Sequence, residues 1–144
     1  MVRAEFDAIW SSEKSIVGDV VFAPAKGTLQ VFTADNIEVL GMGFDGLYVN
    51  LSFDCQFRGL VCNFTLRGIG AIHRYCIGAT IHGDAGRFHE HQIMHGDCVR
   101  QQLPHVVARD DLREMTSEER WHTICQEANI TFTGTFFSPE VQCS

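Results

Sequence analysis

Histidine is the residue type of this 144-residue chain whose spacing suggests chemistry, because all seven histidines lie between His73 and His122. Successive side chains of a strand point to opposite faces, so His89, His91 and His95 would share one face. Imidazoles two residues apart can bind one metal ion, and three protein ligands that leave a position for water are typical of catalytic zinc or iron sites. The sequence therefore predicts a candidate divalent-metal site. Its candidate ligands are His82, His89, His91, His95 and Asp97, with Asp84 as a further donor from a neighbouring turn.

Two other interpretations of the same histidines remain open. Neutral His89 and His91 can act as general acid and base, because the pKa of imidazole lies near neutral pH. A His-x-His pair also occurs on sheet surfaces without any ligand, as a structural or interaction surface, and the sequence favours this interpretation. Arg74 and Arg87 are candidate anion ligands, because a guanidinium group can bind carboxylate or phosphate through two hydrogen bonds. An arginine at a strand end is, however, usually a solvated charge.

No complete catalytic motif accompanies the histidines. The zinc-protease pattern His-Glu-x-x-His, the paired His-x-Ser/Thr pattern of two-histidine phosphodiesterases, the phosphate-binding loop and Gly-x-Ser-x-Gly are all missing from the sequence. Gly83 followed by His89 and His91 resembles the first half of the cupin metal motif, but its glutamate and its second half are missing. The sequence therefore favours a protein that is not an enzyme.

The charge of the chain is acidic, with 18 Asp and Glu residues against 11 Lys and Arg residues and a net charge of −7. A nucleic-acid-binding surface needs Lys and Arg clustered against phosphate groups, and the sequence has no such cluster. We therefore do not expect a broad nucleic-acid interface. An acidic surface suits docking on a basic protein partner.

The six cysteines form no Cys-x-x-Cys pair, and the first residues lack the apolar stretch of a secretion signal. Cys55, Cys62 and Cys76 fall within apolar periodic segments, where a free cysteine behaves as a small buried hydrophobe. We therefore expect reduced, structural cysteines and a cytoplasmic location. No stretch approaches the about 18 consecutive apolar residues that a membrane helix needs, so no membrane association is expected.

Apolar and polar residues alternate strictly over residues 47–57, which predicts a half-buried strand of an antiparallel sheet. A turn at residues 58–59 predicts a hairpin with the next strand, whereas residues 98–115 are expected to form a loop or a partly ordered connection around Pro104. The predicted strands are, in order, 20–22, 28–33, 37–40, 47–57, 61–67, 71–77, 87–94 and 130–133.

Two helices are expected, one near each end of the chain. The apolar residues within 5–10 have helical spacing. Thr116 and Glu119 form a capping box, which predicts the start of a second helix that ends at Asn129. The predicted fold class is a single α+β domain over residues 1–144. It has a mainly antiparallel sheet, an N-terminal helix and a C-terminal helix followed by a short strand.

Residues 71–132 contain an ordered set of features. The set begins with an arginine, a strand-like stretch and a glycine. These are followed by a histidine, a glycine turn, an apolar residue before His-x-His, an acidic linker, a helix and a short strand. The residues are Arg74-Tyr75-Cys76-Ile77-Gly78, His82, Gly86, Phe88-His89-Glu90-His91, Asp111-Leu112, the segment 116–128, Asn129-Ile130 and Phe132. This order resembles a family of small, functionally uncharacterised bacterial proteins, often found on mobile elements. The resemblance implies no known activity, but it implies that the group of His82, His89 and His91 is a property of the fold.

The function expected from the sequence is that of a small acidic cytoplasmic interaction protein, an inhibitor or accessory factor of a mobile element or phage that binds a basic protein. The alternative is a metal-dependent or acid–base hydrolase, centred on His89 and His91, that acts on a phosphate-bearing small molecule or on RNA. A third expectation is a homo-oligomer, formed when an exposed sheet edge pairs with itself.

Overall fold

The computed structural model describes residues 1–82, 86–92 and 105–143. The class of this part of the chain is mixed α+β with mostly sheet, as expected. Its elements are, in chain order, α1 (Arg3–Ser11), β1 (Lys14–Ile16), β2 (Ala23–Pro24), β3 (Val31–Gly41), β4 (Leu47–Asp54), β5 (Gly59–Leu66), β6 (Gly70–His82), β7 (Gly86–Gln92), β8 (His105–Ala108), a 3-10 turn (Asp110–Leu112), α2 (Ser117–Glu127), β9 (Ile130–Phe132) and a last 3-10 turn (Pro139–Gln142).

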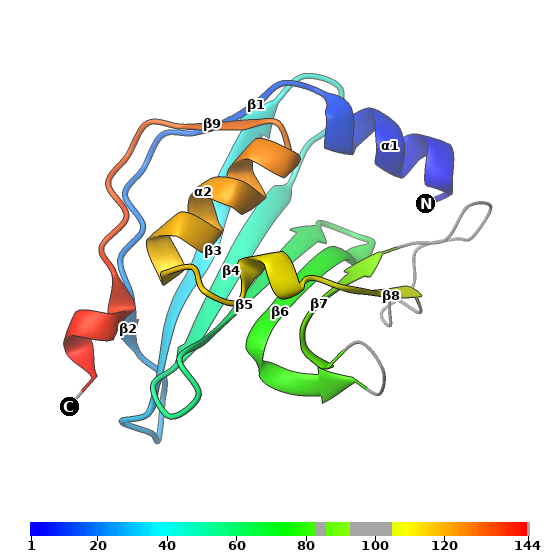
Figure 1. Ribbon diagram of the computed structural model, residues 1–144. Coiled ribbons are helices and arrows are strands. Elements are labelled where there is room, and N and C mark those ends of the chain that lie inside the picture. Colours follow the sequence, from blue (N-terminus) through cyan, green and yellow to red (C-terminus); the bar gives the residue numbers. More distant parts are fainter. Residues whose placement is uncertain (83–85, 93–104, 144) are drawn as a thin grey trace.

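The strands of the described residues form one sheet in the order β8-β7-β6-β5-β4-β3-β1-β9, and β2 pairs with β3 beside this path. Neighbouring strands run antiparallel except β1 and β9, which run parallel. Figure 1 shows the curved sheet with α2 lying across it and α1 at one end. The predicted antiparallel sheet with a helix near each end is thus confirmed. None of the described helices is long and apolar enough to cross a membrane.

The alternation predicted for residues 47–57 is confirmed in β4, where every second residue from Leu47 to Phe53 is at most 2% exposed. The strand ends at Asp54, earlier than predicted. The Asp54 carboxylate accepts hydrogen bonds from the backbone amides of Gln56 (2.8 Å) and Phe57 (3.3 Å), and these bonds turn the chain. Phe57 therefore lies outside the strand and is 45% exposed.

Two other strand predictions were wrong in detail. Residues 28–33 and 37–40 contribute to one long strand, β3, because a bulge between Ala34 and Ile37 keeps the chain in the sheet. At this bulge Asn36 has a positive φ of 56°, and its backbone amide donates to Oδ1 of Asn50 at 2.8 Å. The segment expected to be a loop contains β8, which pairs with β7.

The predicted capping box at the start of α2 is confirmed. The Thr116 hydroxyl accepts a hydrogen bond from the Glu119 amide at 3.2 Å, and the Glu119 carboxylate accepts one from the Thr116 amide at 3.0 Å. Trp121 and Ile124 of this helix are fully buried in the core. The helix ends before Asn129, whose φ of 55° is left-handed.

The N-terminal helix packs on the same face of the sheet as α2. Trp10 of α1 contacts Phe64 of β5 edge-to-face, with ring centroids 5.0 Å apart, and lies 4.4 Å from the ring of His73 on β6. The hydroxyl of Tyr75, two residues further along β6, donates to the Glu127 carboxylate of α2 at 2.8 Å. Side chains at positions 73 and 75 therefore mark the helix-covered face of the sheet.

The expectation that all cysteines are reduced was wrong. A disulfide joins Cys55, just after β4, to Cys143 near the end of the chain, across 88 residues of sequence. Cys62, Cys76 and Cys125 are buried free thiols, as predicted. The spacing of two cysteines so far apart gives no pairing signal, because only the folded chain brings the turn after β4 beside the C-terminal segment.

We predict that removing this disulfide in a Cys55→Ala/Cys143→Ala double variant lowers the free energy of unfolding by about 2–4 kcal/mol, because the bond restricts the unfolded chain. Urea unfolding with and without reductant measures this. Reductant should lower the stability of the wild type and leave the double variant unchanged. A tryptic digest of the non-reduced protein in which the Cys55 and Cys143 peptides run separately would contradict the pairing.

Candidate metal centre

The hairpin of β6 and β7 places the histidine pair opposite two residues of β6. In the antiparallel register His89 lies opposite Cys76, and His91 lies opposite Arg74. Because side chains alternate along a strand, all four residues belong to the face away from α1 and α2. The helix-covered face instead receives Tyr75, which lies between positions 74 and 76.

Three of these side chains converge on one point. Donor atoms of Cys76, His89 and His91, one from each residue, all lie within 4.8 Å of one another, and the three residues are buried. Donor atoms around a tetrahedral zinc ion are about 3.3–3.6 Å apart, given Zn–N and Zn–S distances of about 2.0–2.3 Å. Small side-chain movements therefore suffice for these three groups to bind one ion.

The hydrogen bonding of His89 sets its tautomer. Nδ1 of this ring lies 3.1 Å from the backbone oxygen of Gly86. A carbonyl oxygen can only accept, so Nδ1 carries the proton and the lone pair of the neutral ring is on Nε2. Metal-binding histidines commonly have this arrangement, in which a backbone carbonyl orients the ring through its other nitrogen.

Two opposing effects act on the thiol of Cys76. Burial raises its pKa above the ordinary value, while the positive charge of Arg74 acts in the opposite direction. The free protein therefore holds Cys76 as a thiol. A metal ion would have to displace this proton, and the neighbouring guanidinium group favours the resulting thiolate.

Behind the metal face, Glu90 anchors β7 to the helix layer. Its carboxylate lies 2.7 Å from Nε2 of His73 and accepts a hydrogen bond of 3.1 Å from Arg109. Burial acts to raise the pKa of Glu90, but the hydrogen bonds and charges of His73 and Arg109 outweigh it and lower this pKa below its usual value. Glu90 is therefore an ionised, buried group with one partner on β6 and another, Arg109, directly after β8.

Arg109 extends this anchor to α2. Its guanidinium group donates to Glu127 at 2.6 and 2.8 Å and to Asp111 at 2.9 and 3.0 Å. Arg109 side-chain atoms are only 11% exposed. The network formed by His73, Glu90, Arg109, Asp111 and Glu127 is called the carboxylate network below.

The structure brings together some of the residues named as candidates from sequence. His89 and His91 lie in one group, beside Arg74. His82 is the last residue of β6, and its backbone pairs with that of Gly86. Arg87 is exposed, and its guanidinium group lies over the ring of Phe57 at 5.0 Å from the ring centroid. Three candidate ligands lie outside the described residues: Asp84, His95 and Asp97.

Cys76 is the member of the group that the sequence analysis did not name as a ligand. Its position in an apolar strand suggested a packing role. The signal for it was the hairpin register, since a strand at 71–77 antiparallel to one at 87–94 puts residue 76 opposite residue 89 when the connecting turn is of the right length. The sequence does not determine that length.

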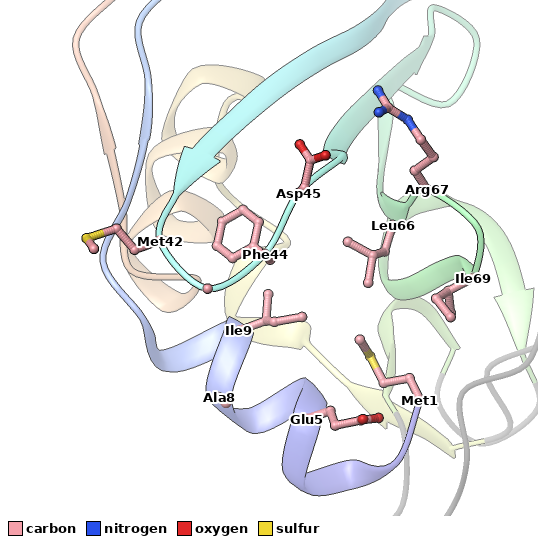
Figure 2. A pocket seen from close by; sticks show the side chains of 11 residues that line it. Met1, Glu5, Ala8, Ile9, Met42, Phe44, Asp45, Leu66, Arg67 and Ile69 are labelled. Atoms are coloured by element: carbon pink, nitrogen blue, oxygen red, sulfur yellow. The ribbon is translucent and has the colours of Figure 1, made fainter.

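A separate hollow of about 550 Å³ lies between α1, the β3–β4 loop and the β5–β6 turn. Figure 2 shows its apolar lining from Met1, Ile9, Phe44 and Leu66, among others. Two of its charged groups have partners within the fold: the Glu5 carboxylate accepts from the Val2 amide at 2.8 Å, and Arg67 donates to the Tyr48 hydroxyl. No convergent donor set comparable to the Cys76 group lies among the described residues that line it.

No protein-family model, no curated protein and no solved structure matches this chain. The resemblance of residues 71–132 to a bacterial family therefore remains a prediction.

We predict that Arg109→Met lowers the free energy of unfolding by about 3–5 kcal/mol, because it leaves Glu90 as a buried charge with one partner fewer. Urea unfolding measures this. Arg113→Met is the matched control: the Arg113–Asp110 pair is exposed, so its loss should cost about 1 kcal/mol or less. Adding Glu90→Gln to Arg109→Met should restore part of the stability. Equal stability of the two single variants would contradict this role for the carboxylate network.

Proposed function

We propose that this protein binds a divalent transition-metal ion, zinc foremost, through Cys76, His89 and His91. The observation that carries the proposal is the convergence of their three donor atoms within 4.8 Å of one another at a buried point of the sheet. Thiolate and imidazole ligands suit zinc and related transition metals, whereas magnesium and calcium prefer oxygen ligands. The donor set therefore favours zinc and related transition-metal ions over magnesium and calcium.

The scaffold supports this proposal because each of the two ligand strands pairs with a neighbouring strand on both sides. Cys76 and His89 face each other across a regular antiparallel ladder, and His91 is two residues along the same strand. The carboxylate network fixes β7 from the opposite side through Glu90. Ligands that need little reorganisation bind a metal at a smaller entropic cost.

A site with three protein ligands can hold one further ligand on a four-coordinate ion. Such an ion can act as a Lewis acid toward a bound oxygen. This feature supports the alternative function expected from the sequence. In that function the protein is a hydrolase that acts on a phosphate-bearing small molecule or on RNA. In that activity the chain's own residues would hold the ion and orient the substrate.

The interaction function expected from the sequence, an inhibitor or accessory factor of a mobile element or phage, stays a prediction alongside metal binding. It depends on the acidic surface and on a basic partner, and the fold adds no observation for or against a particular partner or oligomer. The cytoplasmic location also stays a prediction. The Cys55–Cys143 disulfide weighs against a strongly reducing compartment, where such bonds are rare.

Titration of the purified protein with Co²⁺, a spectroscopic substitute for zinc, tests metal binding directly. We expect one ion per chain and a sulfur-to-cobalt charge-transfer band. Cys76→Ser should abolish the band and weaken binding by more than the about 10- to 100-fold that losing a supporting residue costs. His89→Ala should weaken binding similarly.

Matched controls for this titration are Cys125→Ala and His122→Ala. Cys125 is another buried thiol, and His122 is an exposed histidine, both on α2. Both variants should bind Co²⁺ as the wild type does. A wild type that binds no ion, or a Cys76→Ser variant that keeps both the band and the affinity, would overturn the proposal.

Zinc should also stabilise the folded protein, because the three ligands converge only in the folded chain. At a free zinc concentration 100 times the Kd, the free energy of unfolding should rise by about 2.7 kcal/mol. Urea unfolding with zinc, with magnesium and after chelation measures this. Magnesium should have no effect, and Cys76→Ser should remove the zinc effect. Equal stabilisation of the wild type and of this variant would place the zinc elsewhere on the chain.

A further inference from the structure

Arg74 is the charged neighbour of the proposed metal site. It lies directly opposite His91 in the ladder and two residues before Cys76, on the same face of the sheet. In that position its positive charge acts to lower the pKa of the Cys76 thiol. Within residues 1–82, 86–92 and 105–143, no carboxylate forms an ion pair with it. Arg74 is therefore a cation beside the metal ligands whose charge these residues do not neutralise.

A row of polar residues leads across the sheet to this arginine. Asn50 of β4 lies opposite Asn63 of β5, which lies opposite Arg74 of β6. The side-chain oxygen of Asn50 already accepts a hydrogen bond from the backbone amide of Asn36. The side-chain oxygen of Asn63 is buried and accepts no hydrogen bond from the described residues. Rotating the Asn63 amide by a half turn exchanges oxygen and nitrogen, so this position can present an N–H donor.

The charge balance of the site favours an anion. A divalent ion with one thiolate and two neutral imidazoles has a net charge of +1, and Arg74 adds another positive charge. Glu90, the carboxylate adjacent in sequence to both histidines, points to the opposite face and is held by His73 and Arg109. Partly buried charge of one sign is costly unless an opposite charge pairs with it. An anion from outside the chain would supply that charge.

We propose that the metal ion and Arg74 together form a binding site for a small oxyanion, a phosphate or a carboxylate group, with Asn63 as an additional hydrogen-bond donor. This inference rests on the proposed metal function and names the class of ligand for that same site. An oxyanion has several oxygens, so one can complete the coordination of the ion while others accept from the guanidinium fork. A phosphate monoester and a carboxylate differ in charge and shape, and the two are tested separately.

The test uses the full chain loaded with one equivalent of Co²⁺, titrated with inorganic phosphate in one arm and acetate in the other at constant ionic strength in perchlorate. We expect at least one of the two anions to change the ligand-field bands of the cobalt in a saturable way. Arg74→Gln should weaken this response about 10- to 100-fold, the size of a lost charge-assisted hydrogen bond. Arg74→Lys should recover part of it. Asn63→Ala should weaken it by less than Arg74→Gln does.

Arg87→Gln is the matched control, because Arg87 lies on the same hairpin but is exposed and stacked over Phe57. It should respond to the anion as the wild type does. The Co²⁺ stoichiometry and charge-transfer band of Arg74→Gln show whether this variant is folded and loaded.

The outcomes separate the two proposals. If the wild type binds Co²⁺ but neither anion changes its spectrum, the oxyanion site is wrong and the metal site stands. An Arg74→Gln variant that binds the anion as tightly as the wild type also overturns the role of Arg74. If the wild type binds no Co²⁺, both the metal site and the oxyanion site fall.

Discussion

The contact between the Glu90 carboxylate and its two partners, His73 and Arg109, is the interaction on which the rest of the structure depends. A strand has a period of two, so a slip of one residue would exchange every side chain between its faces. In β7 such a slip would put His89 and His91 under the helices and Glu90 on the other face. The carboxylate network disfavours that register, because His73 would lose its carboxylate partner and Arg109 would lose one of its three carboxylate partners. The convergence of both histidines with Cys76 thus follows from a contact on the opposite side of the sheet.

The helix layer is built on the same residues. Arg109 joins β7 to α2 through Glu127, and Tyr75 donates to the same carboxylate from β6. On the other side, His73 packs against Trp10, which places α1. Each charged group of the network has a direct partner in the chain, which is the condition under which buried charges are tolerated. Among residues 1–82, 86–92 and 105–143, both helices lie on the face opposite the metal ligands.

Much of the fold could be predicted from local sequence patterns, and the errors have physical causes. Alternation identified β4 and β5, and the Thr116–Glu119 capping box identified the start of α2. Each of these signals is formed by residues that are close together in the sequence. The bulge at Asn36 and the Cys55–Cys143 disulfide depend on residues distant in sequence, so local patterns missed them. The candidate site divides in the same way. His89 and His91 are recognisable from their spacing, whereas Cys76 joins them only through the register of the hairpin. Glu90 acquires its role only through its contacts with His73 and Arg109.

The central claim is that one metal ion lies among Cys76, His89 and His91. Crystals grown with zinc, with diffraction data collected on either side of the zinc absorption edge, test it most directly. An anomalous peak within bonding distance of the Cys76 sulfur and of Nε2 of His89, with His91 as the third ligand, is the predicted result. A peak bound to other residues, or none at this site when the protein is saturated with zinc, would contradict the account.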